Sequence, residues 1–216
     1  VTLPAMRRCL VVTTALACLV GLPLVCFGGW EMVLVGAACV LFCFLYTTLL
    51  AQHGMGDVLV LLFFGLVPVC LTYYVTLPPA SQTITAQVVW ASLACGLVID
   101  TLLVVNNYRD YDQDRAVGKK TLIVRMGRER AEQLYGWLGN IATYMMWGCL
   151  VLGDSSFVLM LVCFACFVPY ALLHGATRVQ MRRIGRGREL NKVLGMTARN
   201  MFVFGVTTAI VTLFIL

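Results

Sequence analysis

Long stretches without a charged side chain divide this chain, and they constrain its fold more than any other feature. They cover residues 9–30, 32–56, 58–99, 133–153, 155–177 and 200–216. A helix needs about 20 apolar residues to cross a hydrocarbon core of about 30 Å. Only 12% of the residues are charged, whereas a soluble domain carries roughly a quarter. The sequence therefore excludes soluble folds and indicates membrane-spanning helices.

Each charge-free stretch is long enough for one crossing, and 58–99 is long enough for two. We expect an all-α, polytopic transmembrane helix bundle that forms a single domain over residues 1–216. The seven predicted spans are 9–28, 31–50, 58–76, 84–105, 133–152, 155–175 and 196–216. The chain starts at Val1 rather than Met, which suggests a fragment.

The basic residues predict the orientation of this bundle. All 16 Lys and Arg side chains precede the first span, follow the fourth or follow the sixth. The loops near 28–31, 76–84 and 153–155 contain none. Because basic loops stay in the cytoplasm, we expect the N-terminus inside and the C-terminus outside. The lipid bilayer, and not nucleic acid, is the expected partner of these cations.

The polar stretch from Asp100 to Arg130 contains the candidate site. Its relevant acids and amides are Asp100, Asn106, Asn107, Asp110 and Asp114. If the fourth helix continues past Val105, one of its faces carries Asp100, Asn107, Asp110 and Asp114, which follow one another by steps of seven, three and four residues. Such oxygen donors suit a hard cation such as Mg²⁺, which completes its shell with water and phosphate oxygens.

Directly downstream, a second group of residues is suited to phosphate. Gly118, Lys119, Lys120 and Thr121 offer a flexible backbone, two ammonium groups and a hydroxyl. The alternative is a solvated loop in which Asp and Arg neutralise each other. The regular spacing of the acids and the intramembrane Asp100 favour a metal–phosphate site.

Asp57 opens the third predicted span and has two possible roles. A negative side chain stabilises a helix N-terminus, so Asp57 can be a helix cap. It can equally belong to a site, and the sequence leaves both roles open. The preceding loop contains His53, which is interpreted as a solvent-exposed histidine.

Residues 106–127, NNYRDYDQDRAVGKKTLIVRMG, resemble the second aspartate-rich motif of the UbiA-superfamily intramembrane prenyltransferases. The branch they most resemble comprises the 1,4-dihydroxy-2-naphthoate polyprenyltransferases of menaquinone biosynthesis. Further matches are MRR at 6–8, Tyr46-Thr47, the segment from HGMGD to FFG at 53–65, and IDTLLVV at 99–105.

The resemblance implies a fold and a reaction. Such proteins have nine transmembrane helices around a cavity open to lipid, and two aspartate-rich motifs hold a polyprenyl diphosphate through Mg²⁺. This sequence contains only the second motif, so we expect an N-terminally incomplete domain with the last seven spans. The segment 46–57 is also shorter than in the family and lacks its usual proline. The implied reaction joins a polyprenyl chain to dihydroxynaphthoate in the bacterial inner membrane, at its cytoplasmic side.

The resemblance also assigns roles to residues. Asp110 and Asp114 are expected to bind Mg²⁺ and to be catalytic, with Asn106 or Asn107 assisting. Expected contacts with the diphosphate are Lys119, Lys120 and, more weakly, Arg109. Expected residues of the pocket wall or of acceptor positioning are Tyr46, Asp57 and Asp100.

Several other functions were weighed against this one. The acceptor can be 4-hydroxybenzoate or another aromatic ring. A transporter would place acids at mid-bilayer, whereas here only Asp100 lies deep. A truncated remnant would bind lipid or a partner without catalysis. Phosphatidyl transfer usually needs a D-G-x-x-A-R pattern, which this sequence lacks.

Overall fold

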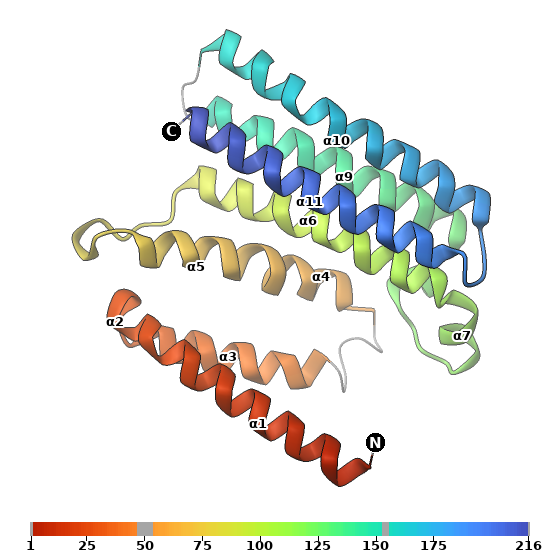
Figure 1. Ribbon diagram of the computed structural model, residues 1–216, viewed down its shortest axis with the longest axis horizontal. Coiled ribbons are helices and arrows are strands. Elements are labelled where there is room, and N and C mark those ends of the chain that lie inside the picture. Colours follow the sequence, from red (N-terminus) through yellow and green to blue (C-terminus); the bar gives the residue numbers. More distant parts are fainter. Residues whose placement is uncertain (1, 47–53, 153–155, 216) are drawn as a thin grey trace.

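The computed structural model describes residues 2–46, 54–152 and 156–215, and within these ranges the chain forms helices and turns without a strand (Figure 1). The helices are α1 (Leu3–Gly21), α2 (Val25–Gly28), α3 (Glu31–Leu45), α4 (Gly56–Val60), α5 (Val67–Thr76), α6 (Ala86–Arg109), α7 (Tyr111–Ala116), α8 (Leu122–Met126), α9 (Arg128–Leu152), α10 (Phe157–Ile184) and α11 (Leu190–Ile215). A π-helical segment, Leu61–Leu66, joins α4 to α5.

Five of the described helical stretches are long and apolar enough to cross a membrane: Leu3–Gly28, Gly56–Thr76, Ala86–Arg109, Phe157–Ile184 and Leu190–Leu213. Together they confirm the all-α polytopic membrane bundle. Helices α3 and α9 occupy the other two predicted spans. Helix α3 is apolar but has only 15 residues, and α9 is not among the five. The ends of the predicted spans at 47–50, 153–155 and 216 lie outside the described residues.

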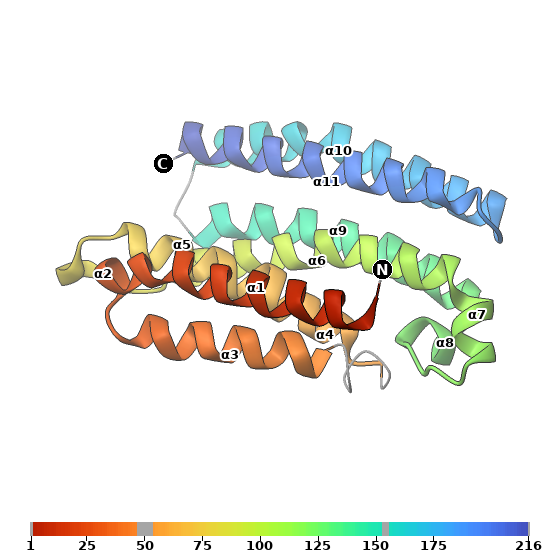
Figure 2. The ribbon, with the colours of Figure 1, turned by 60° about the horizontal axis from the view of Figure 1, so that its bottom comes forward.

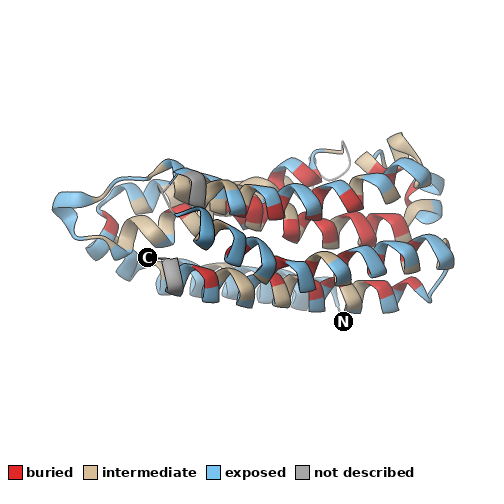
Figure 3. Cartoon of the chain, turned by 90° about the horizontal axis from the view of Figure 1, so that it is seen from above, coloured by how far each residue is buried: buried red, intermediate tan, exposed pale blue. Residues whose placement is uncertain are grey.

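Helix α6 is the centre of the bundle. It contacts α9, α11, α5 and the π-helical segment, and its inward face carries small or branched residues such as Ala94, Val98 and Val104 (Figure 2). One apolar cluster joins α6, α9, α10 and α11 around Phe167 and Phe204. Buried positions accordingly concentrate on the inward faces of the central helices (Figure 3).

The seam between α6 and the preceding helix is unusually close. A Cβ atom on Gly65 would lie 2.7 Å from the Cα of Gly96 and 2.7 Å from the carbonyl oxygen of Ser92. Only glycine permits this backbone-to-backbone approach. The contact fixes the π-helical segment against the middle of α6 and therefore sets the position of α4, which carries Asp57.

Helices α1 and α3 pack at the edge of the bundle (Figure 1). None of their described residues is buried, and the side chain of Val20 is 76% exposed. Exposed aliphatic side chains on every side of a helix are expected where lipid replaces water. Near the α2 end, the Gln82 amide donates a hydrogen bond to the Phe27 carbonyl oxygen at 2.7 Å.

The two chain ends lie at opposite ends of the bundle (Figure 1). The N-terminus lies at the end where α7 and the α10–α11 turn are found, and the C-terminus lies at the other end. The turn after α5 lies in the predicted loop near 76–84, and its 3₁₀ helix covers Pro79–Ser81. The polar stretch is therefore gathered at a single end of an apolar bundle.

Candidate functional site

The fourth predicted helix continues past Val105, as the spacing of its acids required. Helix α6 ends at Arg109, and Asp110 adopts a bridge conformation with φ −88° and ψ 5° before α7 begins. The Asp114 amide still donates to the Asp110 carbonyl oxygen at 2.8 Å. The break at Asp110 interrupts the helical phase, so the side chains on either side of it no longer share one continuous face.

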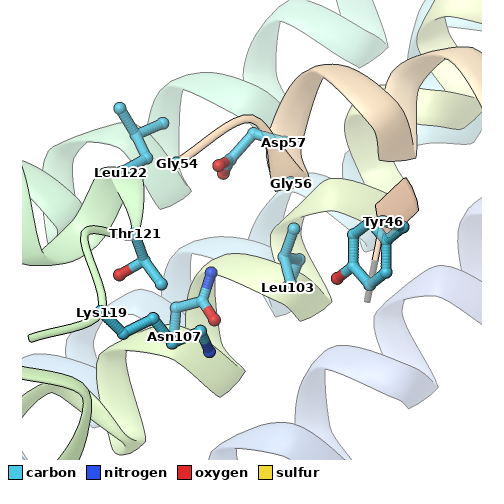
Figure 4. Close-up of a pocket in the computed structure, with 9 residues that line it drawn as sticks. All are labelled: Tyr46, Gly54, Gly56, Asp57, Leu103, Asn107, Lys119, Thr121 and Leu122. Atoms are coloured by element: carbon cyan, nitrogen blue, oxygen red, sulfur yellow. The ribbon is translucent and has the colours of Figure 1, made fainter. Parts of the chain in front are cut away.

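A polar pocket lies beside this break, between the starts of α4 and α8 (Figure 4). Its empty volume is about 250 Å³, part of it open to solvent. Tyr46, Asp57, Asn107 and Lys119, all predicted site residues, belong to its lining, and Thr121 of the predicted phosphate group does too. The remaining lining residues are Gly54, Gly56, Leu103 and Leu122.

Asp57 extends into the pocket and is not the N-cap residue of a helix (Figure 4). The N-cap of α4 is Met55, without a side-chain cap hydrogen bond. The Asp57 side chain is buried, at 7% exposure, and neither carboxylate oxygen has a hydrogen-bond partner among the described residues. A buried carboxylate without a donor is costly. Asp57 also lies in the first turn of α4, where a negative charge stabilises the helix N-terminus, so the structure is compatible with both roles that the sequence left open.

Asp100 is a second buried acid, deeper in the bundle. It is 2% exposed, and its Oδ1 has no partner among the described residues. The carboxyl groups of Asp100 and Asp57 interact electrostatically with each other, and both interact with the Tyr46 hydroxyl. Asp100 does not line the pocket. It lies behind the pocket wall.

Asp114 and Lys119 form an ion pair at the pocket rim. The Lys119 ammonium lies 3.3 Å from both Asp114 carboxylate oxygens, and the Lys119 amide donates to the Asp114 carbonyl at 2.9 Å. The Lys120 side chain is exposed and lies outside the lining. The Lys120 carbonyl instead packs on Gly54, where an added Cβ would lie 2.7 Å away.

Asn106 and Asp110 gather around a different cation, the Arg109 guanidinium. Arg109 bonds both Asp110 carboxylate oxygens, at 2.7 and 2.8 Å, and the Asn106 amide oxygen at 2.8 Å. It also reaches Asn191 of α11 at 3.1 Å. The predicted ligands therefore form two groups, one on Arg109 and one on Lys119.

This division bears on whether Mg²⁺ fits. Among the residues the structure describes, no group of three or more His, Cys, Asp or Glu side chains could hold a metal ion. Mg²⁺ needs only one or two protein carboxylates when substrate phosphates and water complete its shell. The buried Asp114 with Asn107 fits that partial role. The donor set thus suits an ion that arrives with a phosphate ligand.

Nothing in the sequence singles out Arg128, because the polar stretch contains seven Lys and Arg residues and Arg128 is one of them. In the structure it contacts α6, α7 and the α10–α11 turn. Thr121 has a local role besides lining the pocket, because its hydroxyl accepts a hydrogen bond from the Val124 amide and caps α8. His53 and Thr47 lie outside the described residues.

Fold and pocket together define a class: a polytopic helical membrane protein with a pocket of polar and charged residues at one end of its bundle. Within that class, the chain belongs to the UbiA prenyltransferase family, whose family profile matches residues 2–196.

Individual relatives agree with the family. The chain is similar to a 1,4-dihydroxy-2-naphthoate octaprenyltransferase of Escherichia coli, 31% identical over 80% of this chain and 52% of the relative. It is also similar to a 1,4-dihydroxy-2-naphthoate octaprenyltransferase of Mycobacterium tuberculosis, 34% identical over 90% of this chain and 64% of the relative. The chain thus spans between about half and two thirds of the length of these proteins. No solved structure matches it significantly.

Proposed function

We propose that the whole protein transfers a polyprenyl group from its diphosphate to an aromatic acceptor, 1,4-dihydroxy-2-naphthoate, in menaquinone biosynthesis. The observation that carries the proposal is the pocket, which joins Asn107, Lys119 and Thr121 to the unpartnered carboxylate of Asp57 in a chain of this family. The apolar surfaces of the bundle suit the polyprenyl chain, and the polar end suits its diphosphate.

The residues divide the work between the two substrates. Lys119, Lys120 and Arg109 neutralise the diphosphate as it leaves. Asp110 and Asp114 would hold Mg²⁺, with Asn106 or Asn107 as further oxygen donors, once their carboxylates turn from Arg109 and Lys119 toward the diphosphate. Bound Mg²⁺ supplies charge that stabilises the departing diphosphate.

The other side of the pocket serves the acceptor. Tyr46 and Asp57 line it and form hydrogen bonds with the hydroxyl groups of the ring, while Asp100 lies behind them and supports their positions. The apolar surroundings exclude water from the developing allylic cation. A different acceptor, 4-hydroxybenzoate, would need a similar hydroxyl contact, so the assay must include both rings.

We further propose the membrane arrangement. The chain crosses the bacterial inner membrane seven times, with α3 and α9 as the two crossings that length and hydropathy do not establish. The basic end of the bundle and the pocket then face the cytoplasm, and the C-terminus lies outside.

The test measures prenyl transfer by the full-length protein in membranes with Mg²⁺, octaprenyl diphosphate and either acceptor. Asp110→Asn and Asp114→Asn are each expected to abolish transfer, because a neutral amide oxygen binds Mg²⁺ more weakly than a carboxylate does and adds no negative charge. Glu129→Gln is the matched control, since Glu129 is an exposed acid nearby that lies outside the pocket.

All three variants should retain the membrane level and the thermal midpoint of the wild type. Mg²⁺-dependent turnover in either Asp variant would contradict the assigned ligands. Turnover of 4-hydroxybenzoate in preference to dihydroxynaphthoate would contradict the acceptor.

A further inference from the structure

Arg128 joins three elements behind the candidate site. Its Nη1 donates to the Gly185 carbonyl at 2.6 Å, in the α10–α11 turn, and to the Tyr108 carbonyl at 3.1 Å, at the end of α6. Its Nη2 donates to an Asp112 carboxylate oxygen at 3.0 Å, in α7. These are hydrogen bonds to acceptors that are far apart in sequence.

Aromatic rings enclose the same guanidinium. Its central carbon lies 4.8 Å from the ring centroid of Tyr108 and 4.8 Å from that of Tyr111. The Arg128 side chain is only 14% exposed, whereas that of Asp112 is 63% exposed. A cation held against aromatic faces away from water contributes more than an exposed ion pair does.

Only arginine can make this set of contacts. The planar guanidinium presents donors in fixed directions and stacks on rings, whereas the lysine ammonium is a point charge on a flexible stem. The Tyr108 hydroxyl extends the arrangement, because it donates to a Glu132 carboxylate oxygen at 2.8 Å. Both ends of α7 are therefore tied, by Arg128 at Tyr111 and Asp112 and by the Asp114–Lys119 pair at the pocket.

We propose that Arg128 is a positioning residue that holds α7 in register with α6, and thereby fixes where Asp110 and Asp114 present their carboxylates. The inference rests on the proposed prenyl transfer for its functional meaning. Arg128 does not line the pocket, and its contact with Asp112 lies in α7, so we place its action through α7.

The first experiment needs no activity. The full-length protein in detergent is digested with trypsin, and the rates of cleavage after Arg115, Lys119 and Lys120 are followed by mass spectrometry. Arg128→Lys and Arg128→Met are expected to be cleaved at least about tenfold faster than the wild type, because α7 opens more often when its ties are lost. Mg²⁺ with inorganic pyrophosphate should protect the wild type at lower concentrations than it protects either variant.

The second experiment separates positioning from bulk stability. In the transfer assay, both variants should need about tenfold more Mg²⁺ for half-maximal rate, because changing a residue that supports the metal ligands usually weakens metal affinity by about that factor. The KM for the acceptor should change less than about twofold. Arg130→Gln is the matched control, because Arg130 is an exposed arginine two positions along α9. It should match the wild type in both assays.

Smaller changes keep the test decisive if the Arg128 variants do not fold. Asp112→Asn and Tyr111→Leu each remove one tie, and each should give an intermediate rise in cleavage rate and in the Mg²⁺ requirement. Wild-type cleavage together with a wild-type Mg²⁺ requirement in these variants would overturn the proposal. Faster cleavage with an unchanged Mg²⁺ requirement would also overturn it, since Arg128 would then be purely structural. If the wild type transfers no prenyl group, the proposed function fails, while the cleavage and pyrophosphate protection assays still decide on Arg128.

Discussion

Replacing Gly54 with alanine tests how the two loops at the pocket depend on each other. Gly54 has a φ of +74°, and an added Cβ would lie 2.7 Å from the Lys120 carbonyl oxygen and 3.3 Å from the Leu122 amide. The backbone conformation alone costs an L-residue about 1–2 kcal/mol. The steric overlap adds about 1–3 kcal/mol, as overpacking does in other close contacts. The segment from Lys119 to Leu122, which forms one side of the pocket, must therefore move away from α4.

Gly118 provides an internal reference for this prediction. It has the same φ of +74°, but an added Cβ would meet nothing within 4 Å. Gly118→Ala should therefore lose only the conformational part. Thermal unfolding of the purified full-length protein in detergent measures both variants, and Gly54→Ala should have the lower midpoint, by about 2–4 °C for each extra kcal/mol. Equal midpoints for the two variants would refute the reasoning, because the contact with Lys120 would then carry no cost.

Two further predictions concern buried polar groups. Gly139→Ala should lower the thermal midpoint, because the new methyl group would occupy the space of the His174 ring. That ring forms a hydrogen bond with the Tyr135 carbonyl at 2.9 Å. Gly175 has open space around it, so the control variant Gly175→Ala should not lower the midpoint. A Gly139→Ala protein as stable as the wild type would contradict this packing. Asp100→Asn should leave the thermal midpoint unchanged or raise it while it impairs transfer, since a neutral amide is cheaper to bury than an unpartnered carboxylate. A clear loss of stability in that variant would show that Asp100 has a partner essential to the fold.

The sequence predicted the helical bundle well because lipid leaves few alternatives. Uninterrupted apolar stretches of about 20 residues can only satisfy their backbone groups as helices or closed barrels. The seven predicted spans correspond to helices, although the last four residues of the second span lie outside the described residues. What the sequence did not predict was the π-helical segment at Leu61–Leu66, which packs against Gly96, a residue far from it in the sequence.

Several of the predicted site residues line one pocket, but the sequence did not predict how the others group. Helical periodicity placed Asn107, Asp110 and Asp114 on one face, and this holds only while the helix is unbroken. The break at Asp110 turns its carboxylate to Arg109, and Asp114 is left with Lys119. The role of Arg128 also depends on contacts between segments far apart in the chain, such as Gly185, which no local pattern encodes.

The glycine contact in the middle of the bundle has a consequence for how a long lipid could reach the pocket. Where Gly65 meets Gly96, two main chains approach each other directly, because neither glycine has a side chain that would separate them. Separating the π-helical segment from α6 would remove dispersion contacts along the whole interface at once. Helices α1 and α3 form the opposite flank, and none of their described residues is buried. Little packing is therefore lost when these helices move outward. The bundle therefore combines a closely packed seam at α6 with a loosely packed flank at α1 and α3, and we expect a long lipid chain to enter at that flank.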